Sequence, residues 1–489
     1  MDSIKGFLNY NEILYPFYYE DECLSLFPPD EKVLLKDKPS IGDLFHNGLM
    51  NNEKREFINH INLTGTTSKG QDIIFNVVNN PSNDNGFLSF EVYSIFEYNK
   101  TTTMYVKDAG SAPKATEGKR TPLLESRENS IRGFYIQGDE INYFLEASHA
   151  FSSTLEFDDT KKGIESVSVE TKREKEYPCG NIRIGDVEID IFGQRYASYK
   201  NDTIQPLTAK SRLIFAFSKE GNVDIIQDLL YSIRKCFYFL CNRKTMRLNE
   251  AEVFSVYQEG KRNTYGKYAI IDRGNEEQNQ ELKKRIIPCS VLGERLGHLL
   301  QDCVDDKVYT THIPDSYAKR NTYEPDRMIF DCVAFEKEYR RLFPEDKIRS
   351  KAYLEAKSDV LRKVDELIAQ YSGKKKNKAK SIKKSIEKLD TSFGDRVINA
   401  VKLHSIIMDE FIIREYGKNT PSIVKKCGER LNALRNAFAH GNMNYEIIPE
   451  HLSDLKIIEI LFYAMQLRSI GMEDQEAKKA ICGLFGIHI

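Results

Sequence analysis

The chain has no tryptophan and no long hydrophobic run. No stretch of its 489 residues reaches the roughly 18 consecutive apolar side chains of a membrane-spanning helix. The first residues, MDSIKGFLNYNE, include an early acidic side chain and lack the apolar run of a secretory signal peptide. We therefore expect neither membrane spanning nor secretion.

Cysteine is present, but not in a pattern typical of disulfides. Nine cysteines, an odd number, are scattered from Cys23 to Cys482. Disulfide-stapled secreted domains are usually short and have an even number of cysteines at regular spacing. The pattern favours free thiols and a cytoplasmic location.

Several common catalytic motifs are missing as well. There is no phosphate-binding G-x-x-x-x-G-K-[ST] loop, dinucleotide G-x-G-x-x-G fingerprint, G-x-S-x-G elbow or H-E-x-x-H pair. ATP hydrolysis, dinucleotide chemistry and serine-hydrolase activity therefore lack support. Four residues of zinc-ligand type lie within a short span, but their spacings match none of the usual paired-ligand patterns, so we expect no metal and no cofactor: Cys289, His298, Cys303 and His312.

The composition predicts a folded protein of more than one domain. Hydrophobic residues make up 40% of the chain, enough to fill cores, and its length exceeds that of one ordinary domain. Charge is uneven: residues 331–489 have a balance of +6 and residues 1–330 a balance of −8. A basic C-terminal part suits a polyanionic partner, although ordinary compositional drift gives the same difference.

Residues 1–325 are predicted to be mainly β-structure. Phe87–Tyr98 is rich in aromatic and β-branched residues, as strands prefer. Asn181–Ile191 alternates apolar and polar side chains, with one slip near Gly185 that we interpret as a β-bulge. Further expected elements are strands at Ile141–Ala147, Glu165–Thr171 and Leu213–Phe217, a loop at Lys107–Ser130 and a helix at Val223–Cys241.

Helical periodicity dominates residues 326–489. We take the connector before them, Thr310–Pro325, as the domain boundary. The apolar spacing predicts an all-α bundle, so the expected fold class is α+β multidomain. Helices are expected at Arg327–Phe343, Lys347–Tyr371, Lys378–Leu389, Asp395–Tyr416, Pro421–Ala439 and Glu450–Ile470.

The helix predicted at Pro421–Ala439 has the strongest local signals. Thr420 is a good N-cap, Pro421 occupies the first helical position, and Gly441 supplies a residue suited to the helix end. At about 100° per residue, four apolar residues form one stripe, which we expect to be the core face: Ile423, Cys427, Leu434 and Phe438.

The opposite face of this helix is more polar than packing requires. Asn432, Asn436 and His440 recur at every fourth position, so their side chains stack along one ridge. Arg435 lies at the edge of that ridge. Together these residues offer a proton-transfer group, a phosphate binder and amide donors.

The run from Arg435 to Gly441, RNAFAHG, resembles the R-N-x-x-x-H signature of HEPN domains. Residues 326–489 are also similar to that fold in helix order, and the β-rich region before them is similar in layout to ApeA-type abortive-infection proteins, which are bacterial anti-phage factors. Another Arg-x4-His pair, Arg55 and His60, lacks the following Asn. The capped helix and its position in a bundle favour the C-terminal pair.

The resemblance implies a metal-independent endoribonuclease that acts as a homodimer, with both Arg/His sets facing one cleft. The RNA 2′-hydroxyl would attack the adjacent phosphorus and leave a 2′,3′-cyclic phosphate. His440 would be the general acid or base, Arg435 the phosphate binder, and Asn436 a group that orients either. By resemblance, the biological role is abortive infection through cleavage of host RNA, with transfer RNA favoured, and the N-terminal region senses a phage-derived trigger or covers the cleft.

Further RNA contacts are expected from Asn432 and from a lysine run, Lys374, Lys375 and Lys376, in a loop between two helices. A solvated loop is an equally good interpretation of that run. A catalytically silent HEPN module that only dimerises or binds RNA, beside a phage-sensing N-terminal domain, stays open as the alternative function.

Overall fold

The computed structural model describes two compact units. The N-terminal unit comprises Met1–Arg234, Thr245–Lys284 and Pro288–Val304, and the helical unit comprises Lys235–Lys244, Arg285–Ile287 and Asp305–Ile489. The helical unit thus takes in segments that precede residue 326. The described residues are 3–27, 60–79, 81–84, 87–98, 131–157, 164–171, 176–199, 207–246, 248, 250–258, 261–271, 284–344, 351–387, 392–441 and 444–487.

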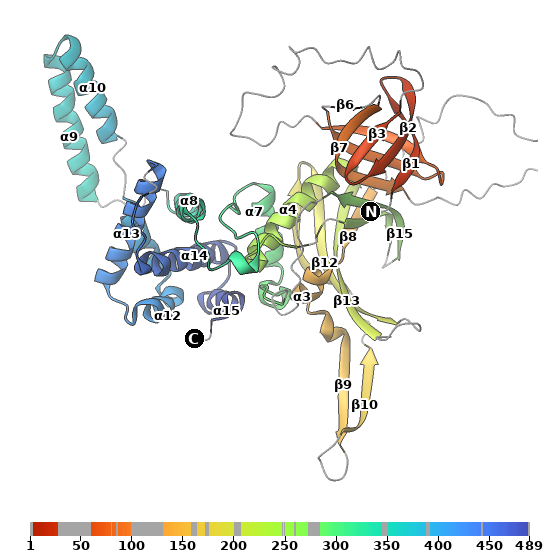
Figure 1. Ribbon diagram of the computed structural model, residues 1–489. Coiled ribbons are helices and arrows are strands. Elements are labelled where there is room, and N and C mark those ends of the chain that lie inside the picture. Colours follow the sequence, from red (N-terminus) through yellow and green to blue (C-terminus); the bar gives the residue numbers. More distant parts are fainter. Residues whose placement is uncertain are drawn as a thin grey trace, which may run out of the picture. The chain divides into compact units, whose positions relative to one another are not determined.

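An antiparallel sheet of 13 strands forms most of the N-terminal unit (Figure 1). β7 pairs with both β3 and β5, so the order β7-β3-β2-β1-β4-β5 closes into a ring around buried apolar side chains such as Tyr15, Phe75 and Phe90. The remaining strands continue from β7 as an open sheet. The strands of the ring are β1 (Ile4–Tyr10), β2 (Ile13–Glu20), β3 (Cys23–Leu26), β4 (His60–Thr67), β5 (Asp72–Val78) and β7 (Phe87–Tyr98). The short strand β6 (Ser82–Asp84) pairs with β7 outside this order.

The open part of the sheet carries short helices on its connections. The strands are β8 (Ile131–Ile136), β11 (Tyr177–Ile184), β12 (Val187–Tyr199), β13 (Leu207–Gly221), β14 (Glu250–Gln258) and β15 (Lys261–Ile270), with β9 (Phe151–Phe157) and β10 (Ile164–Thr171) as a separate hairpin. The helices are α3 (Asp139–Phe144), η1 (Ala147–Ala150), α6 (Cys289–Leu292) and α7 (Arg295–Val304). α4 (Val223–Cys241) begins in this unit and ends in the helical unit.

Two predictions for this unit are wrong. The strand expected at Ile141–Ala147 is α3 followed by η1, because Ile141 and Phe144, three positions apart, are both buried on one helical face. The slip near Gly185 is not a bulge: Gly185 has φ +58° in the turn between β11 and β12, which pair from Ile184↔Val187 onward. Strands β7, β10 and β13 and helix α4 confirm the other predictions, and Lys107–Ser130 lies outside the described residues.

The helical unit is built around α14, in which every residue from Ile457 to Leu467 is buried, on all sides of the helix. α14 packs against α8, α12, α13 and α15, and α11 packs against α13. The fold class α+β, with a β-rich N-terminal region and helices in the C-terminal half, is confirmed. The helices are α8 (Pro325–Leu342), α9 (Lys351–Gln370), α10 (Gly373–Glu387), α11 (Phe393–Leu403), α12 (Ser405–Tyr416), α13 (Pro421–Ala439), α14 (Pro449–Ser469) and α15 (Asp474–Phe485), with η2 (Tyr317–Lys319) before them.

Two helix boundaries differ from the predictions. The single helix expected at Asp395–Tyr416 is interrupted at His404, so that α11 and α12 are separate helices. α10 begins at Gly373, five residues before the predicted start at Lys378, so the lysine run is helical and not a loop. Gly373 has φ +57° and makes the turn from α9 without the strain that another residue would meet there.

The backbones of α11 and α13 touch at a pair of glycines. A Cβ atom added to Gly428 of α13 would lie 2.7 Å from the Cα of Gly394 in α11, closer than real Cβ contacts allow. The obstacle is backbone, which cannot rotate away as a flexible side chain does. α13 therefore holds its position against α11 only while both residues lack a side chain.

Gly428→Ala should lower the thermal unfolding midpoint, because α11 and α13 must move apart to admit the methyl group. A destabilisation of about 1–3 kcal/mol is typical of such overpacking. The matched control is Gly483→Ala in α15, where nothing lies within 4 Å of the added Cβ. It should stabilise by about 0.5–1 kcal/mol, because alanine favours a helix over glycine. Equal effects of the two substitutions in differential scanning calorimetry would refute the close approach.

Candidate active site

The site is built on α13, whose ends are fixed by the signals that the sequence predicted. The Thr420 hydroxyl accepts a hydrogen bond from the Ile423 N–H, and Pro421 occupies the first turn. At the other end His440 is the C-cap residue, and Gly441 turns the chain with φ +76°. The Gly441 N–H donates to the Phe438 carbonyl at 2.9 Å. His440 is therefore held at a defined helix end.

The buried face of α13 is wider than the predicted stripe. Cys427, Leu434 and Phe438 are buried as expected, whereas Ile423 is only half-buried. The prediction omitted several buried residues, namely Val424, Gly428 and Leu431. The buried face therefore extends further round the helix than the predicted stripe, to the side on which Val424, Gly428 and Leu431 lie.

An ion pair in the core fixes α13 to α14. Arg430 donates two hydrogen bonds of 2.7 Å to the carboxylate of Asp454, which is fully buried, and the Tyr416 hydroxyl of α12 also donates to it. A bidentate pair of this kind defines both distance and rotation. The rotation of α13 about its axis, and with it the direction of its polar ridge, is set by this contact.

Arg435 is anchored by a residue that the sequence did not single out. Its guanidinium lies 2.8 Å from the carboxylate of Glu336 on α8, and its side chain is 33% exposed. Its guanidinium carbon also lies 5.8 Å from the centre of the Phe393 ring. No sequence signal marks Glu336, because α8 is distant in sequence and carries several acidic residues. The pair holds the guanidinium at the surface rather than leaving it free to turn.

Glu336 accepts from three arginines at once. Besides Arg435, it pairs with Arg396 of α11 and with Arg340 one turn along α8 at 2.9 Å. The carboxylate is 12% exposed and Arg396 5%. Three guanidinium groups meet at one carboxylate, and those of Arg435 and Arg340 reach the surface. Surface guanidinium groups suit an oxyanion ligand such as a phosphate.

The other predicted site residues lie on the same helix with their side chains accessible. Asn436 and His440 are exposed, and Asn432 is half-exposed. The backbone N–H of His440 donates to the Asn436 carbonyl at 3.1 Å. Within the described part of the chain, neither the Asn436 amide nor the His440 imidazole has a hydrogen-bonding partner. Both are available to a ligand.

The three lysines of the run are consecutive residues of α10, so the helix directs their side chains to different sides. Lys374 is exposed, Lys375 lies over the ring of Tyr371 at 4.1 Å, and Lys376 is half-buried. The three lysines therefore point in different directions and do not form one surface. Of the second Arg-x4-His pair, His60 begins β4 and Arg55 lies outside the described residues.

The four residues of zinc-ligand type do not come together. Cys289, His298 and Cys303 belong to the N-terminal unit, whereas His312 belongs to the helical unit and is buried. In the described ranges of the chain, no group of three or more His, Cys, Asp and Glu side chains is arranged to hold a metal ion. None of the nine cysteines, all of which lie in described residues, forms a disulfide. No described helix is both long and apolar enough to cross a bilayer.

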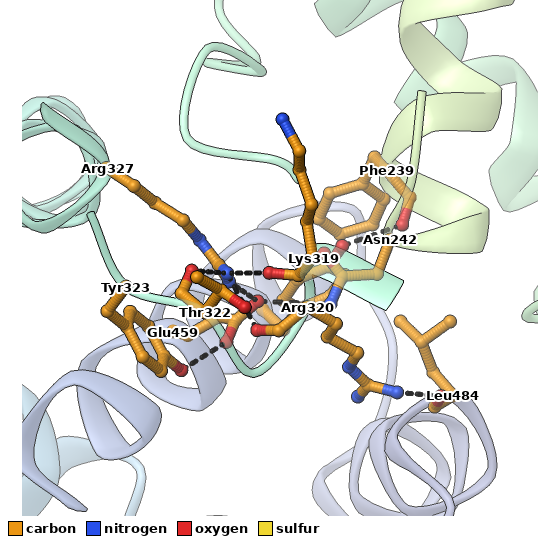
Figure 2. Close-up of polar contacts among 10 residues, drawn as sticks. Phe239, Asn242, Lys319, Arg320, Thr322, Tyr323, Arg327, Glu459 and Leu484 are labelled. Carbon is orange, nitrogen blue, oxygen red and sulfur yellow. Dashed lines mark hydrogen bonds and ion pairs between the residues drawn. The ribbon is translucent and has the colours of Figure 1, made fainter. Parts of the chain in front are cut away.

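A second polar cluster lies in the interior of the helical unit. Arg327 donates from one guanidinium nitrogen to the carbonyls of Lys319, Arg320 and Thr322 (Figure 2), at 2.9, 2.7 and 2.9 Å. The buried carboxylate of Glu459 accepts from Asn242 and Tyr323 and pairs with Arg327 at 3.5 Å (Figure 2). These contacts fix the start of α8 to α14.

His312 and Asp331 lie in the same interior and lack hydrogen-bonding partners within the described residues. Burial lowers the pKa of His312 to about 3, with the charges of Arg327 and Lys244 acting in the same direction. Burial, followed by the charge of Glu459, raises the pKa of Asp331 well above its ordinary value. The cluster therefore favours a neutral His312 and a protonated Asp331.

Comparison of the chain with protein-family models, with curated proteins and with solved structures finds no match.

Glu336→Gln should destabilise the helical unit, because it removes the carboxylate that pairs with the buried Arg396. Removing one partner of a buried ion pair costs about 3–5 kcal/mol, and the remaining amide oxygen moderates the loss. The measurement is thermal unfolding of the full chain. Glu355→Gln on α9 is the control, since its pair with Lys351 is exposed and should matter by less than about 1 kcal/mol. A Glu336→Gln midpoint equal to that of the control would contradict the anchoring role.

His312→Leu should flatten the acid side of the stability profile. The folded-state pKa of His312 is lowered, so its neutral form contributes stability that is complete above the unfolded pKa near 6.5 and is lost as the pH falls toward 3. Relative to the variant, the wild type should lose up to about 1.4 kcal/mol per pH unit below pH 6.5. Urea unfolding at several pH values measures this difference. Parallel profiles for the two proteins would refute it.

Proposed function

We propose that the chain is a metal-independent endoribonuclease of the HEPN type. The observation that carries the proposal is the arrangement on α13: Arg435 is anchored by Glu336 yet one-third exposed, and His440 is exposed at the end of the same helix. The guanidinium groups of Arg435 and Arg340, which reach the surface beside Glu336, suit a phosphate ligand. Asn436 adds an exposed amide between the two.

The chemistry needs no group beyond the RNA and these side chains. A base takes the proton of a 2′-hydroxyl, whose oxygen forms a bond to the adjacent phosphorus. The bond from phosphorus to the 5′-oxygen breaks, and that oxygen receives a proton from an acid. His440 serves proton transfer, because an imidazole ring can accept a proton at one nitrogen and donate one from the other. Arg435 binds the phosphate and offsets the charge that develops in the transition state, and Asn436 orients the imidazole or a phosphate oxygen.

A homodimer formed through the helical unit completes this scheme. One imidazole cannot be base and acid in the same step without an intervening proton exchange, whereas two chains supply two histidines to one cleft. The pairing of two Arg435/His440 sets also doubles the positive charge at the substrate. Dimerisation is part of the proposal and follows the resemblance of α13 to the HEPN signature.

The proposed substrate is host RNA, with transfer RNA favoured, and the proposed role is anti-phage abortive infection in the cytoplasm. Cleavage of an essential RNA would stop translation and with it phage growth. The acidic N-terminal unit would then detect a phage-derived trigger or cover the basic cleft until infection. A fragment of residues 326–489 that is more toxic than the full chain would support the covering role.

One observation favours the alternative of a catalytically silent module. Arg435 already has a counter-ion within its own chain, as a purely structural arginine would. In that case the helical unit would dimerise or bind RNA without cutting it, and the N-terminal unit would carry the protective function. The two functions differ in whether His440 is needed.

His440→Ala should reduce RNA cleavage by about 10²–10⁴-fold, the usual contribution of a general acid or base. The assay is the full-length protein with labelled transfer RNA in the presence of EDTA, and the fold should be unchanged because His440 is exposed at a helix end. His149→Ala, which removes another exposed imidazole, is the control and should cleave as the wild type does. Phage protection that survives His440→Ala would favour the silent module instead.

A further inference from the structure

The outer face of α10 is a strongly basic surface that the proposed active site does not use. α10 contains seven lysines and a single acidic residue, Glu387, within 15 residues. It lies beside α9 as a helical hairpin (Figure 1). Four of the lysines are exposed and have no ion-pair partner within the described part of the chain: Lys374, Lys378, Lys380 and Lys384.

These four lysines form two rows along one side of the helix. At about 100° per residue, Lys374 and Lys378 make one row and Lys380 and Lys384 the other, each with i, i+4 spacing. Between the rows runs a line of small polar residues, which are exposed: Asn377, Ser381 and Ser385. Like charges four residues apart weaken an isolated helix, so local stability does not account for the pattern.

Most other charges of the hairpin have partners; of the rest, the exposed Lys375 lies over the ring of Tyr371 and Lys376 is half-buried. Lys383 donates to both carboxylate oxygens of Asp365 at 2.7 Å, and Ala379 marks the buried side of α10. The basic residues of α9 all have partners, through ion pairs to acidic neighbours or a backbone carbonyl: Lys351, Lys357, Arg362 and Lys363. Unneutralised charge is thus concentrated on the outer face of α10.

We propose that this face binds the sugar-phosphate backbone of the RNA substrate. The inference rests on the proposed ribonuclease function and adds a docking surface that does no chemistry. An α-helix with its side chains is about 10–12 Å across, so two lysine rows on it contact phosphates on both sides of the central line. Asn377, Ser381 and Ser385 leave that line free of bulk. Asn377 and Ser381 offer hydrogen bonds to phosphate oxygens, whereas the Ser385 hydroxyl donates to the Ser381 carbonyl.

A lipid surface fits this face less well than RNA does. Helices that lie on membranes need an apolar face that enters the acyl region beside their basic residues. The line between the lysine rows is polar throughout. The exposed Ile382 follows Lys378 at i+4, on the side away from that line, and a single isoleucine does not make an apolar face. Phosphate contacts without apolar insertion are characteristic of nucleic-acid backbones.

The test measures binding of a fluorescein-labelled RNA stem-loop and of an unstructured RNA of equal length. All variants are made in the full-length His440→Ala protein so that no RNA is cut. The test variant changes Lys374, Lys378, Lys380 and Lys384 to Gln. The matched control removes four charges from α9 by changing Lys351, Lys357, Arg362 and Lys363 to Gln. A third protein has Arg at the four α10 positions, which keeps the charge.

The test variant should bind the stem-loop about tenfold or more weakly than its parent, and the slope of log affinity against log salt should fall by up to about 3–4 between 50 and 200 mM KCl. The α9 control should lose much less, and the arginine variant should bind like its parent. An unchanged salt slope in the test variant overturns the inference. So does binding to phosphatidylglycerol vesicles that the same four lysines support in place of RNA binding.

The two proposals fail in different ways. RNA that is bound through α10 but is not cut by the protein with His440 intact would refute the ribonuclease and leave the docking surface in place. RNA that is cut, with affinity unaffected by the α10 substitutions, would refute the docking surface alone.

Discussion

The carboxylate of Glu336 is the point on which the candidate site depends. It joins α8, α11 and α13 through Arg396 and Arg435, and it holds the Arg435 guanidinium at the surface. An arginine fixed in this way loses less side-chain entropy when it binds a phosphate than a freely moving one does. The same pair that stabilises the helical unit therefore prepares Arg435 for an anion.

The position of α13 is determined by its neighbours rather than by its own sequence. The contact between Gly394 and Gly428 sets its distance from α11, and the pair of Arg430 with Asp454 sets its rotation against α14. Both Arg430 and Gly428 lie within about two turns of Arg435 along α13. The packing and ion pairs that hold α13 in the helical unit therefore also position the candidate site.

Local signals in the sequence predicted the elements whose patterns are strong. Thr420, Pro421 and Gly441 marked the limits of α13 because caps act within a few residues, and the spacing of apolar side chains located α4 and β7. Ile141–Ala147 was mistaken for a strand, because a short apolar run does not distinguish a strand from a buried helix. Glu336, Asp454 and the glycine contact depend on tertiary packing between distant segments, which no local pattern encodes. The predicted ridge of Asn432, Asn436 and His440 is accessible on α13. The lysine run, which was predicted to be a loop, lies in helix α10.

The most direct test of the account concerns the chemistry of the RNA itself. One RNA that the protein cuts is compared with the same RNA carrying a single 2′-deoxynucleotide on the 5′ side of the cut. The account predicts that cleavage at this position stops, because the attacking oxygen is missing, and that the unmodified RNA yields a 2′,3′-cyclic phosphate end. Cleavage of both RNAs at the same rate would contradict it, since another nucleophile would then attack the phosphorus.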